Sequence, residues 1–88
     1  MIRVLIVEDD PMARQLLEIY VEKSGLYTLA QSVESAAFAE LCCRAQQVDL
    51  ILMDVCTALN ASGLEAAEKI KQEFPYIKII IITISKCS

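Results

Sequence analysis

Acidic side chains gather directly after two separate apolar runs of the sequence. Glu8, Asp9 and Asp10 follow the run at 2–7, and Asp54 ends a second run at 49–54. Crowded carboxylates repel one another unless a cation neutralises them. The chain contains no His, and a site built from oxygen ligands selects a hard cation, above all Mg²⁺, which binds one or two carboxylates and keeps several waters. The acids therefore predict a Mg²⁺ site, provided that the two runs end at the same place.

The elements that must position these acids alternate along the chain. Four apolar, β-branched runs predict strands: 2–7, 27–33, 49–54 and 77–84. Three segments with helical spacing lie between them: 11–25, 34–47 and 62–74. Alternating strands and helices predict an α/β fold in which helices cover both faces of a parallel sheet, because parallel neighbours need right-handed crossovers. The carboxyl ends of the strands then meet at one edge, where such sheets bind ligands, and Thr83 at the end of the fourth run joins the acids there.

Each of these residues also has an ordinary structural explanation. Asp10 precedes Pro11 and is better explained as the N-cap of the first helix, with proline at the first helical position. Glu8 and Asp9 could likewise decorate a helix N-terminus, and Asp54 could be an ordinary N-cap or loop carboxylate after a buried strand. Thr83 could be one more β-branched strand residue. The occurrence of acids after two strands is what favours a metal site over these explanations.

Inward and outward faces can be expected for the first two helices. The first helix places Ala13, Leu16, Leu17, Tyr20 and Val21 on one face and ends at Gly25. The second is rich in Ala, and Ser32 and Ser35 are its candidate caps. The adjacent Cys42 and Cys43 of that helix are not expected to face inward together.

Length, charge and cysteine spacing limit the classes of protein. The chain has 88 residues, 56% of them hydrophobic, and a net charge of −4, which predicts one packed domain over 1–88. An acidic chain without a basic run is not expected to contact nucleic acid directly. No apolar stretch is long enough for a membrane span. The four cysteines (Cys42, Cys43, Cys56 and Cys87) lack C-x-x-C spacing, so we expect free thiols in a reducing cytoplasm.

Several of these segments together resemble the receiver domain of two-component response regulators. They are "VLIVEDDP", "DLILMD", Gly63 at the start of the third helix, and "IIIIT". The resemblance covers the whole chain and implies a flavodoxin-like fold. It also implies that Asp54 accepts a phosphoryl group from a sensor histidine kinase, while Glu8 and Asp9 help Asp54 to hold Mg²⁺. The backbone carbonyl of Cys56 would be a further metal ligand, and the Thr83 hydroxyl would contact the phosphoryl oxygens.

The residue types agree with that chemistry. A carboxylate such as Asp54 can attack phosphorus as a nucleophile, and phosphoryl transfer asks little of a protein beyond positioning and charge neutralisation. Two alternatives remain open. One is a structural or assembly fragment without signalling activity, and the other is a small Mg²⁺-dependent phosphatase that uses the same aspartate.

The chain departs from the receiver pattern after the fourth strand. It stops at Ser88, so we expect a strand order of 2-1-3-4 that lacks the fifth βα unit and the lysine that the family carries there. Lys86 is not an obvious substitute, because it follows Thr83 on the tail. The fourth strand, with Ile79–Ile82, would lack a neighbour and the helix over one face, and such an apolar edge invites another chain. We therefore expect a homodimer or larger assembly, impaired phosphorylation, and a DNA-binding output domain, if there is one, outside this segment.

Overall fold

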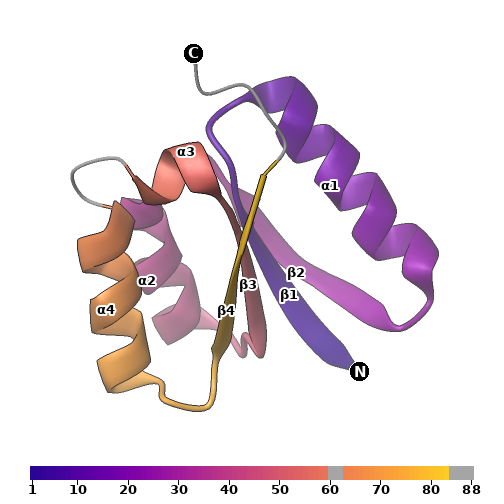
Figure 1. Ribbon diagram of the computed structural model, residues 1–88. Coiled ribbons are helices and arrows are strands. Elements are labelled where there is room, and N and C mark those ends of the chain that lie inside the picture. Colours follow the sequence, from indigo (N-terminus) through magenta and orange to yellow (C-terminus); the bar gives the residue numbers. More distant parts are fainter. Residues whose placement is uncertain (60–62, 84–88) are drawn as a thin grey trace.

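The computed structural model describes residues 1–59 and 63–83, and within them the α/β fold is the one expected (Figure 1). The strands are β1 (Ile2–Val7), β2 (Tyr27–Val33), β3 (Leu50–Asp54) and β4 (Lys78–Ile82). The helices are α1 (Pro11–Ser24), α2 (Ala36–Ala45), α3 (Val55–Ala58) and α4 (Gly63–Glu73). Each predicted strand and helix is present with ends shifted by at most two residues, whereas α3 was not predicted. The expectations for Lys86 and Cys87 concern residues outside the described ranges.

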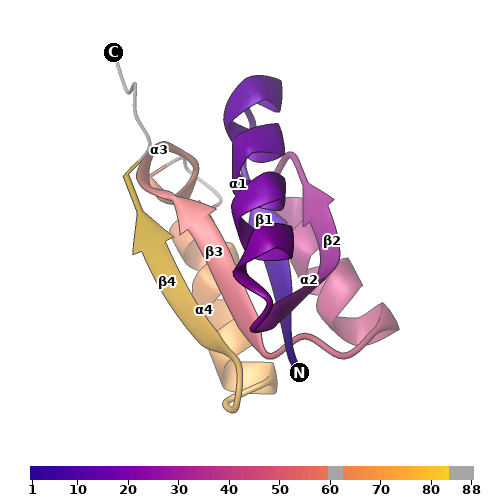
Figure 2. The ribbon, with the colours of Figure 1, turned by 90° about the vertical axis from the view of Figure 1, so that its right-hand side faces the viewer.

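The four strands form one parallel sheet in the order β2-β1-β3-β4, which confirms the predicted flavodoxin-like arrangement. Helix α1 covers one face, and α2 and α4 cover the other (Figure 2). The side chains of each strand therefore divide between two cores. The larger core joins Leu5, Ile51 and Met53 to α2 and α4, and the smaller joins Val4 and Ile6 to α1.

Helix α1 begins as its sequence predicts. The Asp10 carboxylate accepts the backbone N–H of Ala13 at 2.8 Å, and Pro11 is the first helical residue, so Asp10 is the N-cap. Gly25 ends the helix in the left-handed conformation, with φ of 73°. The expected inner face was too broad, because Leu16 and Tyr20 are exposed. Only one narrow stripe of this helix reaches the sheet, and these two residues lie beside it.

Helix α2 corrects the expectation for its cysteines, because Cys42 and Cys43 are both buried. Neighbouring helical residues lie about 100° apart, so both can fit within a wide apolar stripe. The stripe of α2 is wide because this helix contacts the sheet and α4 at the same time. Ser35 is the N-cap residue, as one of the two candidates, but its side chain makes no capping hydrogen bond.

Strand β4 is the outer strand of the described sheet (Figure 2). Ile79 packs against the larger core and Ile82 against the smaller, so successive side chains alternate between the two faces. Ile80 and Ile81 remain 39% and 43% exposed. Two partly exposed isoleucines agree with the expectation, but they belong to opposite faces rather than to one, because neighbouring side chains of a strand point to opposite faces of the sheet. No helix among the described residues combines the length and the apolar character that a bilayer span requires.

Candidate functional site

The sheet register brings the ends of β1, β3 and β4 to one level. Val7 of β1 pairs with Met53 of β3, so that Glu8 and Asp54 are the next residues of their strands. Asp54 in turn pairs with Ile82, the last residue of β4. Thr83 follows directly. The acids that are far apart in the sequence are therefore neighbours at the carboxyl edge of the sheet, as the sequence predicted.

Glu8 is the most confined of these acids, because its side chain is only 1% exposed. One carboxylate oxygen, Oε2, accepts the backbone N–H of Asp10 at 2.8 Å, while Oε1 is buried with no hydrogen-bond partner. Burial raises the pKa of Glu8 above its ordinary value, and the neighbouring carboxylates of Asp9 and Asp54 raise it further, against the lowering effect of the Asp10 N–H. These effects place the charge of Asp54 within electrostatic reach of Glu8.

A buried carboxylate oxygen without a partner, beside two further acids, is an arrangement that a divalent cation would relieve. The residues therefore fit Mg²⁺. Within residues 1–59 and 63–83, no three acidic, cysteine or histidine side chains already converge as a ready-made metal cage. Mg²⁺ does not require one, since it commonly binds one or two carboxylates and keeps several waters.

Asp54 lies at the junction of β3 and α3. Its side chain is 4% exposed and accepts the backbone N–H of Cys56 at 3.0 Å, so that Asp54 caps α3. A cap and a functional carboxylate are the two alternatives that the sequence offers for Asp54, and the cap is confirmed. It does not exclude the other role, because this bond uses only one of the two carboxylate oxygens, Oδ2.

Helix α3 adds a polar residue that the sequence analysis missed. The Thr57 side chain is buried, and its hydroxyl oxygen has no hydrogen-bond partner. The sequence signal for Thr57 is a hydroxyl residue three positions after Asp54. This signal is weak, because Val55–Ala58 is too short a segment to show a helical pattern. Gly63 opens α4 against this turn, and a Cβ there would meet the backbone carbonyl oxygens of Thr57 and Ala58, the latter at 2.8 Å. Glycine at 63 is therefore a steric requirement of the site.

The remaining predicted residues lie close by. Asp9 follows Glu8 and is exposed, and Thr83 is exposed directly after β4. Arg14 of α1 donates to the backbone oxygen of Glu8 at 2.9 Å and so fixes the end of β1. Cys56 is disulfide-bonded, which corrects the expectation of four free thiols. Sequence spacing does not reveal which sulfurs the fold brings within bonding distance.

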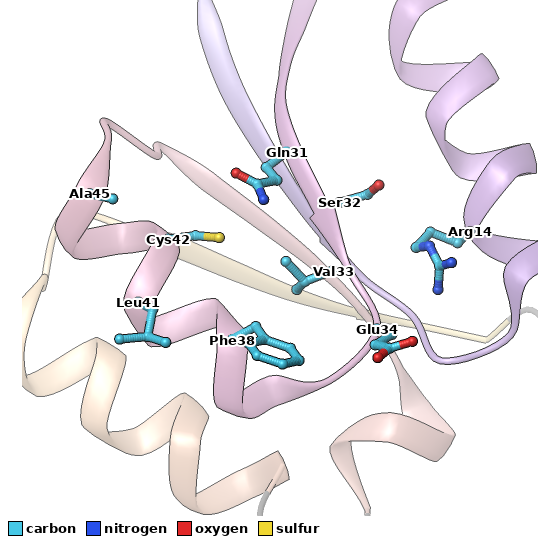
Figure 3. Close-up of a pocket in the computed structure, with 9 residues that line it drawn as sticks. All are labelled: Arg14, Gln31, Ser32, Val33, Glu34, Phe38, Leu41, Cys42 and Ala45. Carbon is cyan, nitrogen blue, oxygen red and sulfur yellow. The ribbon is translucent and has the colours of Figure 1, made fainter.

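A separate hollow of about 530 Å³ lies beside β2, at the edge of the sheet away from β4 (Figure 3). Val33, Glu34 and the α2 residues Phe38, Leu41 and Cys42 line it, with Arg14 on the side of α1. None of Glu8, Asp9 and Asp54 lines this hollow. The chemistry of the chain is thus concentrated on the open rim of the sheet rather than in this depression.

Solved structures share this fold. The response regulator MaeR bound to beryllium trifluoride superposes with a TM-score of 0.80 at 28% sequence identity, covering 98% of this chain and 70% of MaeR. The isolated receiver domain of RcsB from Salmonella enterica serovar Typhimurium has a TM-score of 0.81 at 17% identity, over 97% of this chain and 63% of that one. The second likeness concerns the fold alone.

Relatives with curated descriptions are also named as regulators. The probable C4-dicarboxylate response regulator DctR of Halalkalibacterium halodurans is 31% identical over 94% of this chain, and the transcriptional regulatory protein YdfI of Bacillus subtilis is 33% identical over 92%. The chain spans only 36% and 38% of the lengths of these two proteins. The sequence pattern of the response regulator receiver domain matches residues 4–87. With the acids at the carboxyl ends of β1 and β3, this match shows that the chain belongs to the response regulator receiver domain family.

Proposed function

We propose that this chain is a phosphoacceptor receiver of a two-component system and that Asp54 takes the phosphoryl group. One observation carries the proposal: the buried Asp54 carboxylate shares the carboxyl edge of the sheet with the buried Glu8, whose carboxylate lacks a full set of partners. Such a site has an excess of negative charge, and the repulsion between its carboxylates is unfavourable. A divalent cation would offset this charge and so allow an anionic phosphoryl group to bind beside it.

The site residues have separate roles in the proposed phosphoryl transfer. An oxygen of Asp54 attacks phosphorus, the new O–P bond forms, and the bond from phosphorus to its donor breaks, with the electron pair leaving on the donor. Mg²⁺, held by Glu8, Asp9, Asp54 and the backbone carbonyl of Cys56, would neutralise the charge on the phosphoryl oxygens. The N–H of Cys56 holds the Asp54 carboxylate in place before the reaction.

Thr83 is assigned the contact to the phosphoryl group. It directly follows Ile82, the register partner of Asp54, and its exposed side chain is free to reorient. When the Thr83 hydroxyl donates to the phosphoryl oxygens, the conformation at the end of β4 would change. We propose that phosphorylation is read out as this change at β4.

The donor that suits this role is a sensor histidine kinase in the cytoplasm. One relative that is 35% identical over 91% of this chain, the autoinducer 1 sensor kinase/phosphatase LuxN of Vibrio harveyi, carries its similar segment within a much longer protein. Relatives that are named as transcriptional or response regulators suggest that this segment serves regulation of transcription. Turnover of a phosphate ester as a product-releasing enzyme is not part of the proposal.

Phosphorylation of Asp54 is directly testable. The chain is incubated with Mg²⁺ and acetyl phosphate or beryllofluoride, and intact-mass spectrometry or fluorine NMR detects the adduct. We expect one adduct per chain, lost in Asp54→Asn and in the absence of Mg²⁺. Asp49→Asn is the matched control, because Asp49 lies at the opposite end of β3 and its Asn retains an acceptor for the Arg3 backbone N–H.

Each result separates the proposal from its alternatives. An adduct that survives Asp54→Asn contradicts the assignment of the acceptor. The absence of any adduct in the unmodified chain would favour the structural or assembly role. Continuous release of phosphate from a generic phosphate ester would favour the phosphatase.

A further inference from the structure

Glu8 lies just beyond the end of β1, yet both of its backbone groups are held. Its N–H donates to the Val33 carbonyl of β2 at 3.0 Å, and its carbonyl accepts from Nη1 of Arg14 on α1 at 2.9 Å. The Glu8 side chain is almost fully buried, and one of its carboxylate oxygens has no partner. The main chain of this confined acid is therefore fixed from a strand on one side and from an arginine side chain on the other.

Arg14 supplies a donor that the sheet does not provide. In a parallel pair, the N–H and the carbonyl of one residue bond to residues two apart on the neighbouring strand. Val33 and Ser35 would therefore be the partners of Glu8 if β2 continued. However, β2 ends at Val33, and Ser35 is the N-cap residue of α2. The guanidinium of Arg14 takes the place of the missing strand and extends the ordered part of β1 by one residue.

Arg14 is itself fixed at its backbone and at its tip. The Asp10 cap and Pro11 determine where α1 begins, and the Arg14 N–H donates to the Asp10 carbonyl at 2.9 Å. The guanidinium then reaches back to Glu8, six residues earlier in the chain. This contact closes the loop that contains Asp9. Because Asp9 lies between two anchored residues, its position also depends on Arg14.

The charge of Arg14 is not used in an ion pair with a described carboxylate. Both salt bridges within residues 1–59 and 63–83 belong to Arg44. The half-buried Arg14 side chain lies beside the end of β2 (Figure 3). A guanidinium stays protonated and donates in a fixed planar fork, so it holds a carbonyl in one direction. A charge that only decorates the surface would make no such directional bond.

We propose that Arg14 is a positioning residue of the acidic site, which holds the Glu8 backbone so that the carboxylates of Glu8 and Asp9 are set for a divalent cation. This role rests on the proposed function, in which Mg²⁺ binds at this rim. Arg14 contacts the backbone of Glu8, so we assign it an effect on metal binding and none on phosphorus itself. Groups that orient a metal ligand in this way contribute about 10- to 100-fold in metal affinity.

The direction of the effect separates positioning from charge. A cation beside the site repels Mg²⁺, so loss of the Arg14 charge alone would strengthen metal binding. Loss of positioning would weaken it. Arg14→Met removes the charge and the donors but keeps an unbranched stem, whereas Arg14→Lys keeps the charge and a donor. Arg44→Met is the matched control, because it removes the same charge from a residue whose partners are Glu40 and Glu73.

Metal binding is measured without any phosphoryl donor. Magnesium chloride is titrated into each chain, and NMR follows the amides of Glu8 and Asp54. We expect Arg14→Met and Arg14→Gln to weaken binding by about tenfold or more, Arg14→Lys to recover part of that loss, and Arg44→Met to bind like the unmodified chain. Urea unfolding verifies that each variant is folded. Unchanged or tighter binding by Arg14→Met and Arg14→Gln overturns the proposal.

Amide hydrogen exchange tests the positioning without metal. The Asp10 N–H donates to a carboxylate oxygen of Glu8 at 2.8 Å, and the Ala13 N–H donates to the Asp10 carboxylate. In Arg14→Met we expect exchange to be faster by about fivefold at Glu8 and Asp10. Exchange at Ala13 should stay the same, because the helix cap does not need the guanidinium. Unchanged exchange at both Glu8 and Asp10 shows that Arg14 does not hold them.

Adduct formation with acetyl phosphate separates this role from a contact to phosphorus. We expect Arg14→Met to need about tenfold more Mg²⁺ for its half-maximal rate and to approach the unmodified rate at saturating Mg²⁺. A lower rate at saturating Mg²⁺ with an unchanged Mg²⁺ dependence contradicts positioning through Glu8. If the unmodified chain forms no adduct and binds no Mg²⁺, the proposed function fails, while amide exchange still decides whether Arg14 holds Glu8.

Discussion

Glu8 shows how one residue can report on the charge of the whole site. Its carboxylate is buried between a single backbone N–H donor and two other acids. Burial and these like charges raise its pKa, so the folded chain holds the Glu8 proton more tightly than the unfolded chain. The free energy of unfolding must therefore fall as pH rises, from about 4.3, the ordinary pKa of glutamate, to the raised value in the folded state. Above that value the loss is complete and constant.

Glu8→Gln should remove this pH dependence. Without Mg²⁺, the variant is expected to be more stable than the unmodified chain near neutral pH, because it buries no charge, and to show a flatter profile above about pH 4.3. Urea unfolding at a series of pH values measures the difference. Glu68→Gln, at an exposed glutamate of α4, is the control. If the free energy of unfolding had the same pH dependence in Glu8→Gln and in the unmodified chain, the pKa of Glu8 would not be raised by folding.

The thiols of Cys42 and Cys43 should be nearly inert in the folded chain. Burial raises the pKa of Cys43 to about 11, with smaller effects of Cys42 and Glu40, and burial also raises the pKa of Cys42. Only the thiolate reacts readily. Alkylation with iodoacetamide at pH 8, followed by peptide mass spectrometry, should label Cys43 about a hundredfold more slowly than in urea, and Cys42 should also be labelled more slowly in the folded chain. Fast labelling of Cys43 would show that α2 opens readily.

At the scale of elements, the short helix α3 holds the acceptor loop in position. Asp54 caps it, and Gly63 allows α4 to start in contact with the backbone of Thr57 and Ala58. The sequence predicted the helix that begins at Gly63 but not α3, because four residues are too few for a periodic pattern. Its formation depends on the cap and on contacts with α4 and β4.

Gly63→Ala should therefore damage the site through the backbone. The added methyl group would meet two carbonyl oxygens of α3, and relief requires α3 or α4 to move. We expect a loss of about 1–3 kcal/mol in the free energy of unfolding and slower adduct formation at Asp54. Thermal unfolding and the acetyl phosphate assay measure the two effects. Ala67→Gly exchanges the same two residue types in the interior of α4 and therefore measures the effect of helix propensity alone. A Gly63→Ala chain as stable and as reactive as the unmodified one would contradict the steric account.

At the scale of the whole molecule, the sheet separates two apolar cores. The larger core joins Leu5, Ile51 and Met53 to α2 and α4, and the smaller joins Val4 and Ile6 to α1. A small domain has a total stability of only about 5–15 kcal/mol, so burial in both cores is needed to keep the carboxyl ends of β1 and β3 in register.

Most of the fold was accessible from local patterns. The β-branched runs, the cap at Asp10 and the stop at Gly25 are each written in a few neighbouring residues, and parallel connectivity follows from the alternation of strands and helices. Local pattern also predicted that Glu8 and Asp54 meet, because both follow strands of one parallel sheet. Tertiary packing was needed for the rest. The burial of both Cys42 and Cys43, the exposure of Leu16 and Tyr20, the short helix α3 and the disulfide of Cys56 depend on which surfaces lie against each element, and side chains distant in sequence create those surfaces.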